Sequence, residues 1–374
     1  MEFRDLKKQY QVLKTDIDAA VNRVLANANF ISGKEVRELE EILAEYVGVR
    51  HCITCGNGTD ALVLALMAWG IGEGDAVFVP DFTFFASGEA PALCGATSVF
   101  VDVERDTFNI SPECLEKAII RVINEKTLIP KAIVAVDLFG QPADYIKIAK
   151  IAEQYGLFIL EDGAQGFGGR IESKKACSFG DIGTTSFFPA KPLGCYGDGG
   201  AIFTDNDEWA EIIRSLCIHG KGQNKYDNVR IGINSRLDTI QAAILQIKFK
   251  QFVKYELEKT NEIASWYAQM LDGIVQIPKF KNGFSSSWAQ YTILFEKKQN
   301  RDNLQNKLKQ WNIPTMIYYT KGLHEQKAFK EKGMSVDNYQ NTKFLSEHVL
   351  SIPIHAYMDK NNVEEIVKRI EREL

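Results

Sequence analysis

Short apolar runs alternate with helical stretches between about residues 50 and 205. The apolar runs do not alternate with polar residues, so they predict strands buried on both faces, at residues 77–80, 98–102, 132–136, 157–160 and 201–204. Between them, residues 113–123 and 144–155 have the periodicity of amphipathic helices. This order predicts an α/β fold with a mostly parallel sheet, in which ligands bind beyond the carboxyl ends of the strands.

The pattern changes after residue 237. Residues 237–271 form a long helical stretch without proline or glycine. A strand-like run at 291–295 and amphipathic stretches at 301–311 and 363–374 follow it. We therefore expect a large α/β domain over residues 1–245, with a helical segment at its start, and a smaller α+β domain over residues 246–374.

Composition narrows the class of protein. The chain has 374 residues, of which 45% are hydrophobic and 25% charged, with a net charge of −5, as expected for a soluble globular protein that does not bind nucleic acid. The charged start does not resemble a signal peptide, and the best apolar stretch, residues 61–69, is too short to cross a bilayer. These features predict a cytoplasmic protein without a membrane anchor.

Cysteines and histidines offer no ligand set for a metal. The seven cysteines are scattered, and an odd number without a secretion signal argues against a disulfide framework. Cys52 and Cys55 form a lone CxxC, which we interpret as two structural thiols near a strand end. None of the five histidines has metal-ligand spacing to another. We expect no metal site, although His219 can face a substrate pocket.

Lys191 is the most informative residue of the chain. It lies among aromatic residues, prolines and glycines in the run TTSFFPAKPLGCYGDGG, residues 184–200. A lysine in a dry pocket has a lowered pKa and becomes nucleophilic, so it can form a Schiff base with pyridoxal phosphate. Asp162, at the end of the apolar run before it, can pair with the pyridine nitrogen of that cofactor.

Other segments supply candidate contacts. Gly58 and Thr59 precede an apolar helix and can cradle a phosphate, with Thr59 as a possible cap and Ser186 as a further hydroxyl. One of the three phenylalanines of residues 82–85 can stack on a flat ring, while the other two are expected in the core.

Two polar segments allow either a capping or a binding interpretation. Gln165 either caps a helix that starts after Asp162 or reaches the same site as that aspartate. Asn234 or Ser235 can cap the long helix, while Arg236 can instead bind a carboxylate or phosphate.

Four blocks in one order resemble the DegT/StrS-type sugar aminotransferases: NGTDAL at 57–62, EDGAQ at 161–165, SFFPAKPLGCYGDGGAIFT at 186–204 and NSRLDTIQAAIL at 234–245. The resemblance covers nearly the whole chain. It implies the aspartate-aminotransferase type I fold, with a mostly parallel sheet of seven-stranded type flanked by helices, pyridoxal phosphate as cofactor, and a homodimer with shared active sites.

The resemblance also implies roles for individual residues. Lys191 holds the cofactor as a Schiff base and then moves a proton, and Asp162 keeps the pyridine nitrogen protonated. Gln165 lies near the phenolic oxygen and Phe84 stacks on the ring. The phosphate is bound by Gly58, Thr59, Ser186 and, from the neighbouring subunit, Asn234.

The sequence around Lys191 is most similar to that of a subgroup whose members aminate a UDP-linked 3-oxo-2-acetamido sugar acid with L-glutamate, for surface-polysaccharide biosynthesis. There Arg236 is a candidate partner for the sugar carboxylate. Tyr318 and Tyr319 stand where relatives often have His-Tyr near the sugar, so a 4-keto sugar or a dTDP-3-keto-6-deoxysugar stays open as the substrate. A dehydratase of the same fold would carry histidine in place of Lys191, and a non-catalytic regulator would not need Lys191 or Asp162.

Overall fold

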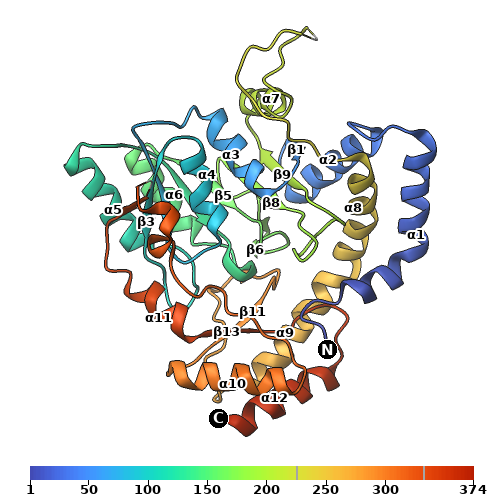
Figure 1. Ribbon diagram of the computed structural model, residues 1–374, viewed down its shortest axis with the longest axis vertical. Coiled ribbons are helices and arrows are strands. Elements are labelled where there is room, and N and C mark those ends of the chain that lie inside the picture. The colour runs from blue at the N-terminus through green and yellow to red at the C-terminus, as the bar shows by residue number, and fades with distance from the viewer. Residues whose placement is uncertain (225, 332) are drawn as a thin grey trace.

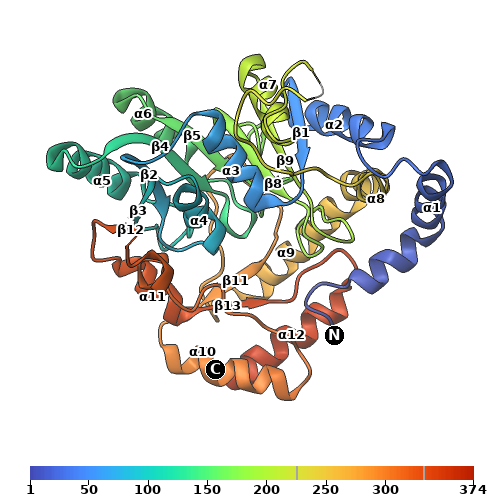
Figure 2. The same ribbon diagram turned by 45° about the horizontal axis from the view of Figure 1, so that its top comes forward.

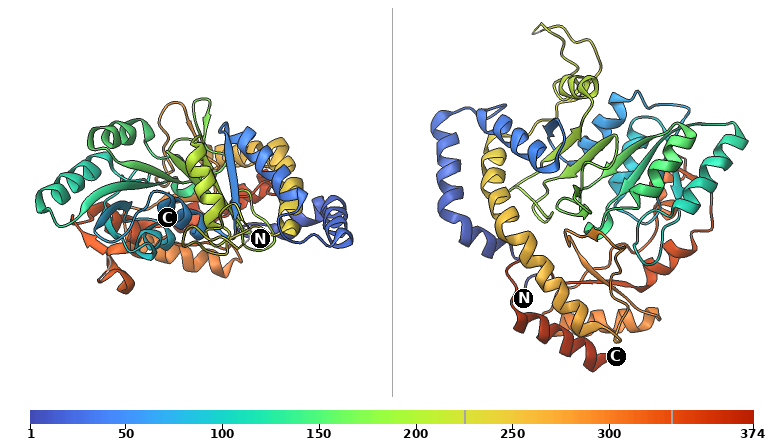
Figure 3. Two further views of the ribbon diagram at one scale, coloured as in Figure 1. Left: turned by 90° about the horizontal axis from the view of Figure 1, so that it is seen from above. Right: turned by 180° about the vertical axis from the view of Figure 1, so that it is seen from behind.

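The computed structural model describes residues 1–224, 226–331 and 333–374. A large sheet with helices on both faces forms the upper part of the molecule in Figure 1, and a smaller layer of helices and a two-stranded sheet lies below it. The N-terminus lies between these two parts, beside the long helix that connects them (Figure 3).

The large sheet has eight strands. Their spatial order is β1 (His51–Cys55), β9 (Gly200–Thr204), β8 (Ile182–Ser186), β5 (Phe158–Asp162), β4 (Ile129–Val136), β2 (Asp75–Pro80), β3 (Thr97–Val101) and β12 (Gly333–Ser335). Each neighbouring pair is parallel except those of β9, which runs antiparallel to β1 and β8. The expected mostly parallel sheet is confirmed, and β12 joins it from the C-terminal part of the chain.

Both faces of the central strands are covered. In β2, Val77 and Val79 pack in the apolar cluster of one face, while Ala76 and Phe78 pack in the cluster of the other. The first face is covered by α3 (Gly58–Ala68), α4 (Phe85–Leu93) and α7 (Asp207–Leu216), and the second by α5 (Pro112–Glu125) and α6 (Tyr145–Tyr155). Figure 2 shows the same layering. Burial on both faces explains why these strands read as continuous apolar runs.

A column of helices borders the sheet beyond β1. It consists of α1 (Leu6–Asn27), α2 (Lys34–Val47) and α8 (Thr239–Gln251), which continues through a π-helical turn, η2 (Phe252–Glu256), into α9 (Leu257–Leu271). The long helix expected over residues 237–271 is thus present, but it begins at Thr239 and contains one wider turn. Such turns insert an extra residue per turn and redirect the side chains around them.

The smaller layer has an apolar core of its own. Strand β11 (Tyr291–Leu294) pairs antiparallel with β13 (Val349–Ile352), and both pack with α9, α10 (Lys298–Gln310) and α12 (Lys360–Glu373). Helix α11 (Gln340–His348) leads into β13. The remaining short elements are η1 (Leu138–Gly140), β6 (Arg170–Ile171), β7 (Lys174–Lys175), β10 (Phe284–Ser285), η3 (Leu323–Glu325) and η4 (Lys327–Phe329). The expected division after residue 245 stays a prediction, because α8 runs through that position and β12 belongs to the large sheet.

Strand β8 is not apparent in the sequence, because Thr184, Thr185 and Ser186 are polar and form no apolar run. Thr184 and Thr185 are nevertheless buried. Their hydroxyls donate to the carbonyls of Glu161 and Gly163 over 2.9 and 3.1 Å, which compensates the cost of removing them from water. In the part of the chain that the structure describes, no helix is both long and apolar enough to cross a membrane.

Candidate active site

Asp162 is the last residue of β5 and lies at the carboxyl edge of the sheet, where ligands of such folds bind. Its carboxylate is buried. Oδ2 accepts a hydrogen bond from the Ser87 hydroxyl over 2.7 Å, and Oδ1 accepts one from the Ala164 N–H over 3.2 Å. The Thr83 hydroxyl lies 3.2 Å from that of Ser87 and extends this chain. The carboxylate is therefore oriented, and it retains lone pairs for a protonated ring nitrogen.

Lys191 lies in the loop between β8 and β9. Burial lowers the pKa of its amine, the charge of Asp162 raises it in part, and the charge of Arg4 lowers it further. The net shift is downward. A lysine with a lowered pKa has a larger neutral, nucleophilic fraction near pH 7, as expected from the sequence around it.

Gly58 and Ser186 meet at the start of α3. A Cβ atom on Gly58 would lie 2.6 Å from the Cβ of Ser186, so only glycine allows this approach. Thr59 follows in the first turn of the helix, whose free N–H groups attract anions. The expected cap at Thr59 is wrong: Asn57 is the N-cap, and its side chain accepts from the Asp60 N–H over 2.8 Å. This leaves the Thr59 hydroxyl available to a phosphate.

Residues 234–236 border the same helix start. The Ser235 hydroxyl accepts from the Gly56 N–H over 2.8 Å and donates to Asp60 over 2.6 Å. Capping of the long helix by Asn234 or Ser235 is therefore wrong, since α8 has Asp238 at its N-cap. Asn234 and Arg236, on either side of buried Ser235, are exposed.

The three phenylalanines after β2 divide as expected. Phe82 is fully buried, and Phe85 packs against the core cluster of the first sheet face. Phe84 is 54% exposed and its ring centroid lies 6.4 Å from that of Tyr319. An exposed aromatic ring at the end of a strand provides a flat apolar surface for a ligand.

Gln165 connects the end of β5 to the segment that follows α10. No helix starts after Asp162, since residues 164–168 form turns, so Gln165 is not part of a helix cap. Its Oε1 accepts from the Phe139 N–H over 2.7 Å, and its Nε2 donates to the Tyr319 hydroxyl over 3.1 Å. Burial raises the pKa of both Tyr319 and Tyr318, so both hydroxyls keep their protons near neutral pH.

His219 lies apart from this group. It is exposed three residues after the end of α7, and its backbone N–H donates to the Ile233 carbonyl over 3.0 Å. Among the described residues, no hydrogen bond or ring contact joins its imidazole to Lys191, Asp162 or Tyr319. A single chain thus brings together the candidates around β5 and α3 but leaves His219, Asn234 and Arg236 on its surface.

Sequence reasoning missed Ser87. The hydroxyl lies in the segment that carries Phe84, but its bond to Asp162 joins residues 75 positions apart, which no local pattern reveals.

The pocket residues of this chain fit pyridoxal phosphate: an oriented carboxylate, a lysine of lowered pKa, a glycine-containing helix start and an exposed aromatic ring. Together with the fold they define a pyridoxal-phosphate-dependent aminotransferase. Residues 11–371 match the DegT/DnrJ/EryC1/StrS aminotransferase family, and the chain belongs to this family.

Relatives cover the chain almost completely. It is 41% identical to UDP-2-acetamido-2-deoxy-3-oxo-D-glucuronate aminotransferase of Pseudomonas aeruginosa, over 97% of this chain and 98% of that protein. It is 36% identical to dTDP-3-amino-3,6-dideoxy-alpha-D-galactopyranose transaminase of Aneurinibacillus thermoaerophilus, over 100% and 98%. The crystal structure of a family member from Brucella abortus superposes with a TM-score of 0.97 at 48% identity, covering 100% of this chain and 99% of that one.

Proposed function

We propose that this protein transfers the amino group of L-glutamate to the keto carbon of a nucleotide-linked sugar, leaving 2-oxoglutarate and an aminosugar. The observation that carries the proposal is the meeting of Lys191, with its lowered pKa, and the Ser87-oriented Asp162 at one edge of the sheet. The favoured acceptor is a UDP-linked 3-oxo-2-acetamido sugar acid for surface-polysaccharide biosynthesis, because the relative from Pseudomonas aeruginosa is named for such a substrate.

The residues proposed to contact the cofactor lie at or near the ends of the strands. Gly58, Thr59 and Ser186 would bind the phosphate, Phe84 would stack on the ring, and Gln165 would lie near the phenolic oxygen. Pyridoxal phosphate, when bound, supplies an electron-withdrawing ring that stabilises the negative charge left when a neighbouring carbon loses a proton. With the cofactor bound, Asp162 would hold a proton on the ring nitrogen, and the Lys191 amine would hold the cofactor covalently and would accept and return a carbon-bound proton.

The sugar side of the site is proposed to include Tyr318 and Tyr319, whose protonated hydroxyls can donate to sugar oxygens. Arg236 is proposed to bind the carboxylate of a sugar acid, since a guanidinium forms two parallel bonds with a carboxylate. His219 is proposed to contact the acceptor as well. Arg236 and His219 are exposed in one chain, which supports a site that a second chain completes.

We propose a homodimer for this reason. Large apolar side chains are exposed near these residues: Phe30 and Ile31 at 44% each, Val229 at 55% and Ile231 at 89%. A surface of this kind is typical of an interface between subunits. Asn234, exposed beside Arg236, would then reach the phosphate of the partner's cofactor. All seven cysteines are free thiols, which supports a cytoplasmic location for the dimer.

The first experiment follows the absorption spectrum of the purified protein with pyridoxal phosphate. We expect a visible band that fades when L-glutamate is added, while a band of the aminated cofactor grows near the ultraviolet. Lys191→Ala should bind the cofactor without turnover. A visible band that is indifferent to glutamate would contradict the proposed donor, and a turnover-competent Lys191→Ala would contradict the role of the lysine.

The second candidate is amination of a dTDP-linked 3-keto-6-deoxysugar or of a 4-keto sugar. The relative from Aneurinibacillus thermoaerophilus, which is named as a dTDP-aminosugar transaminase, favours it. Running the reaction in reverse, with 2-oxoglutarate and a panel of UDP- and dTDP-linked aminosugars, separates the two. Faster 2-oxoglutarate consumption with a UDP-linked 3-amino sugar acid supports the first candidate, and faster consumption with a dTDP sugar supports the second.

A further inference from the structure

The first residues of the chain reach the loop of the catalytic lysine. Arg4 Nη2 donates to the carbonyl oxygen of Pro192, the residue after Lys191, over 3.3 Å. The ring of Phe3 lies edge-on to that of Tyr318 with centroids 6.5 Å apart. Residues 3 and 4 therefore touch the lysine loop on one side and the tyrosine pair on the other.

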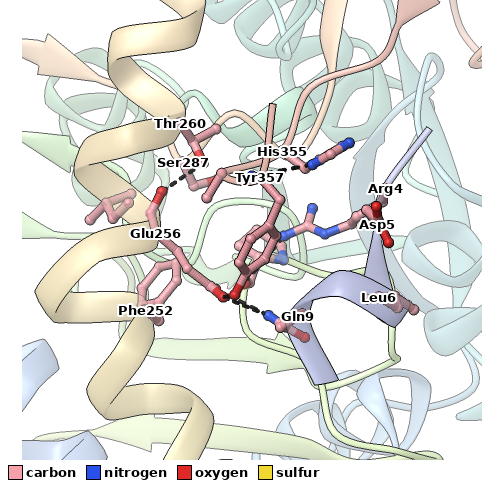
Figure 4. Close-up of a pocket in the computed structure, with 13 residues that line it drawn as sticks. Arg4, Asp5, Leu6, Gln9, Phe252, Glu256, Thr260, Ser287, His355 and Tyr357 are labelled. Carbon is pink, nitrogen blue, oxygen red and sulfur yellow. Dashed lines mark hydrogen bonds between the residues drawn. The ribbon is translucent and has the colours of Figure 1, made fainter. Parts of the chain in front are cut away.

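Figure 4 shows the small pocket into which Arg4 points, between the N-terminal segment, α9 and the loop that carries His355 and Tyr357. Glu256, at the end of the π-helical turn, faces the same pocket. Its carboxylate accepts from Gln9 Nε2 over 2.9 Å and from the Tyr357 hydroxyl over 2.6 Å. These bonds anchor α1 to the pocket and so hold the segment in front of it, residues 1–5, in place.

Arg4 has no ion-pair partner of its own. Among residues 1–224, 226–331 and 333–374, no carboxylate oxygen lies within 4.0 Å of its guanidinium, and its hydrogen bond goes to a neutral carbonyl. Glu256 attracts it from a greater distance while its own oxygens bond to neutral donors. Arg4 is half-buried, and partly removing a guanidinium from water without a close counter-ion costs free energy.

We propose that Arg4 is a positioning residue for Lys191: its guanidinium holds the Pro192 carbonyl and places a fixed positive charge beside the lysine amine. The inference rests on the proposed role of Lys191 as the cofactor-binding lysine. Holding the peptide group between Pro192 and Leu193 limits the conformations of the loop at Lys191, and the positive charge disfavours protonation of the amine. The groups that act on this amine are Asp162, which favours the protonated form, and Arg4, which opposes it.

The test compares Arg4→Gln, Arg4→Lys and the wild type, all loaded with pyridoxal phosphate. The readout is the pH midpoint at which the visible absorption band changes in the absence of substrates. Removing a neighbouring positive charge favours the protonated form, so Arg4→Gln should move the midpoint upward by about half a pH unit or more. Arg4→Lys keeps the charge and should restore the wild-type midpoint.

Lys7→Gln is the matched control, since it removes the same charge from an exposed position at the start of α1. Its midpoint should not move. An unchanged midpoint in Arg4→Gln, or a shift that Arg4→Lys fails to reverse, would overturn the role of Arg4. Borohydride reduction followed by peptide mapping separates the role of Arg4 from the proposed function. If the cofactor of the wild type is not attached to Lys191, the proposed function fails, whatever the midpoint of the Arg4 variants.

Discussion

The side-chain amide of Gln165 donates a hydrogen bond to the hydroxyl of Tyr319 over 3.1 Å. The two residues are 154 positions apart, and the bond joins the turn after β5 to the segment between α10 and η3. Because the other end of the amide accepts from the Phe139 N–H, Gln165 has a fixed orientation. The position of Tyr319 is thus tied to the strand end that carries Asp162.

This bond predicts different effects for the two neighbouring tyrosines. Tyr319→Phe removes the acceptor of the Gln165 amide and should lower the free energy of unfolding by about 1 kcal/mol. Tyr318→Phe is the matched control, because no hydrogen bond of the Tyr318 hydroxyl exists among the described residues, and it should unfold as the wild type does. Urea denaturation measures both. Equal losses would contradict a special role for the Gln165–Tyr319 pair.

The Ser87–Asp162 bond predicts an effect on cofactor affinity. Ser87→Ala removes the donor that orients the carboxylate, so the Kd for pyridoxal phosphate should rise about 10-fold, as for other residues that orient a ligand-binding group. The control is Ser351→Ala, which also loses a buried hydroxyl bond, to the Thr292 hydroxyl over 2.8 Å, but in the two-stranded sheet of the smaller layer. Fluorescence titration of the cofactor-free proteins measures the Kd. If both variants weaken binding equally, the effect reflects general stability.

The close approach of Gly58 to Ser186 predicts that an added methyl group disturbs the phosphate site. In Gly58→Ala the new Cβ would lie 2.6 Å from the Cβ of Ser186, so one of the two segments must move, at a cost of about 1–3 kcal/mol. We expect weaker binding of pyridoxal phosphate. Gly72→Ala serves as the control, because the atom nearest to its new Cβ lies 3.8 Å away. Retention of full cofactor affinity in Gly58→Ala would argue against a cradle at this position.

A buried pair of acids beneath the site predicts a pH dependence of stability. Burial raises the pKa of Glu161 to about 7, although three backbone N–H groups of residues 177–180 partly oppose the shift. Burial and the charge of Glu161 raise the pKa of Asp137 well above its usual range. In the folded state these groups hold protons that the unfolded chain has lost, so their contribution to stability is complete below the unfolded pKa values, near pH 4, and declines as pH rises towards 7.

Asp137→Asn mimics the protonated acid at one member of the pair. It should therefore flatten the decrease in stability between pH 5 and about 7, by about 1 kcal/mol or more for each unit of pKa shift that it removes. Urea denaturation at a series of pH values gives the slope. Glu161→Gln is the contrasting variant: its amide would face the N–H donors of Phe179 and Gly180, so it should be less stable at every pH. If the stability of Asp137→Asn depends on pH as steeply as that of the wild type, the pair does not hold the proposed proton.

The sequence by itself determined the architecture of the sheet and the two charged residues at its edge. Strands such as β2 and β4 are buried on both faces and therefore read as apolar runs. Asp162 ends such a run, whereas Lys191 is marked by its neighbours in the loop between β8 and β9. Such patterns reflect local physical requirements. Burial of a strand on both faces selects apolar residues, and a residue at the carboxyl end of a strand lies where ligands bind. The same logic did not identify β8, because its threonines meet their hydrogen-bonding requirements through contacts that only the folded chain provides.

Only the tertiary structure decided which polar groups meet. Ser235 looks like a helix cap in the sequence but bonds to Gly56 and Asp60, 179 and 175 positions away. Gln165 looks like half of a capping pair with Asp162, yet its partners are Phe139 and Tyr319. Arg4 lies in an unremarkable charged start and reaches the carbonyl next to the catalytic lysine, 188 positions further along. Hydrogen bonds depend on distance and angle in space, which the order of residues along the chain does not specify until the strands and helices have packed.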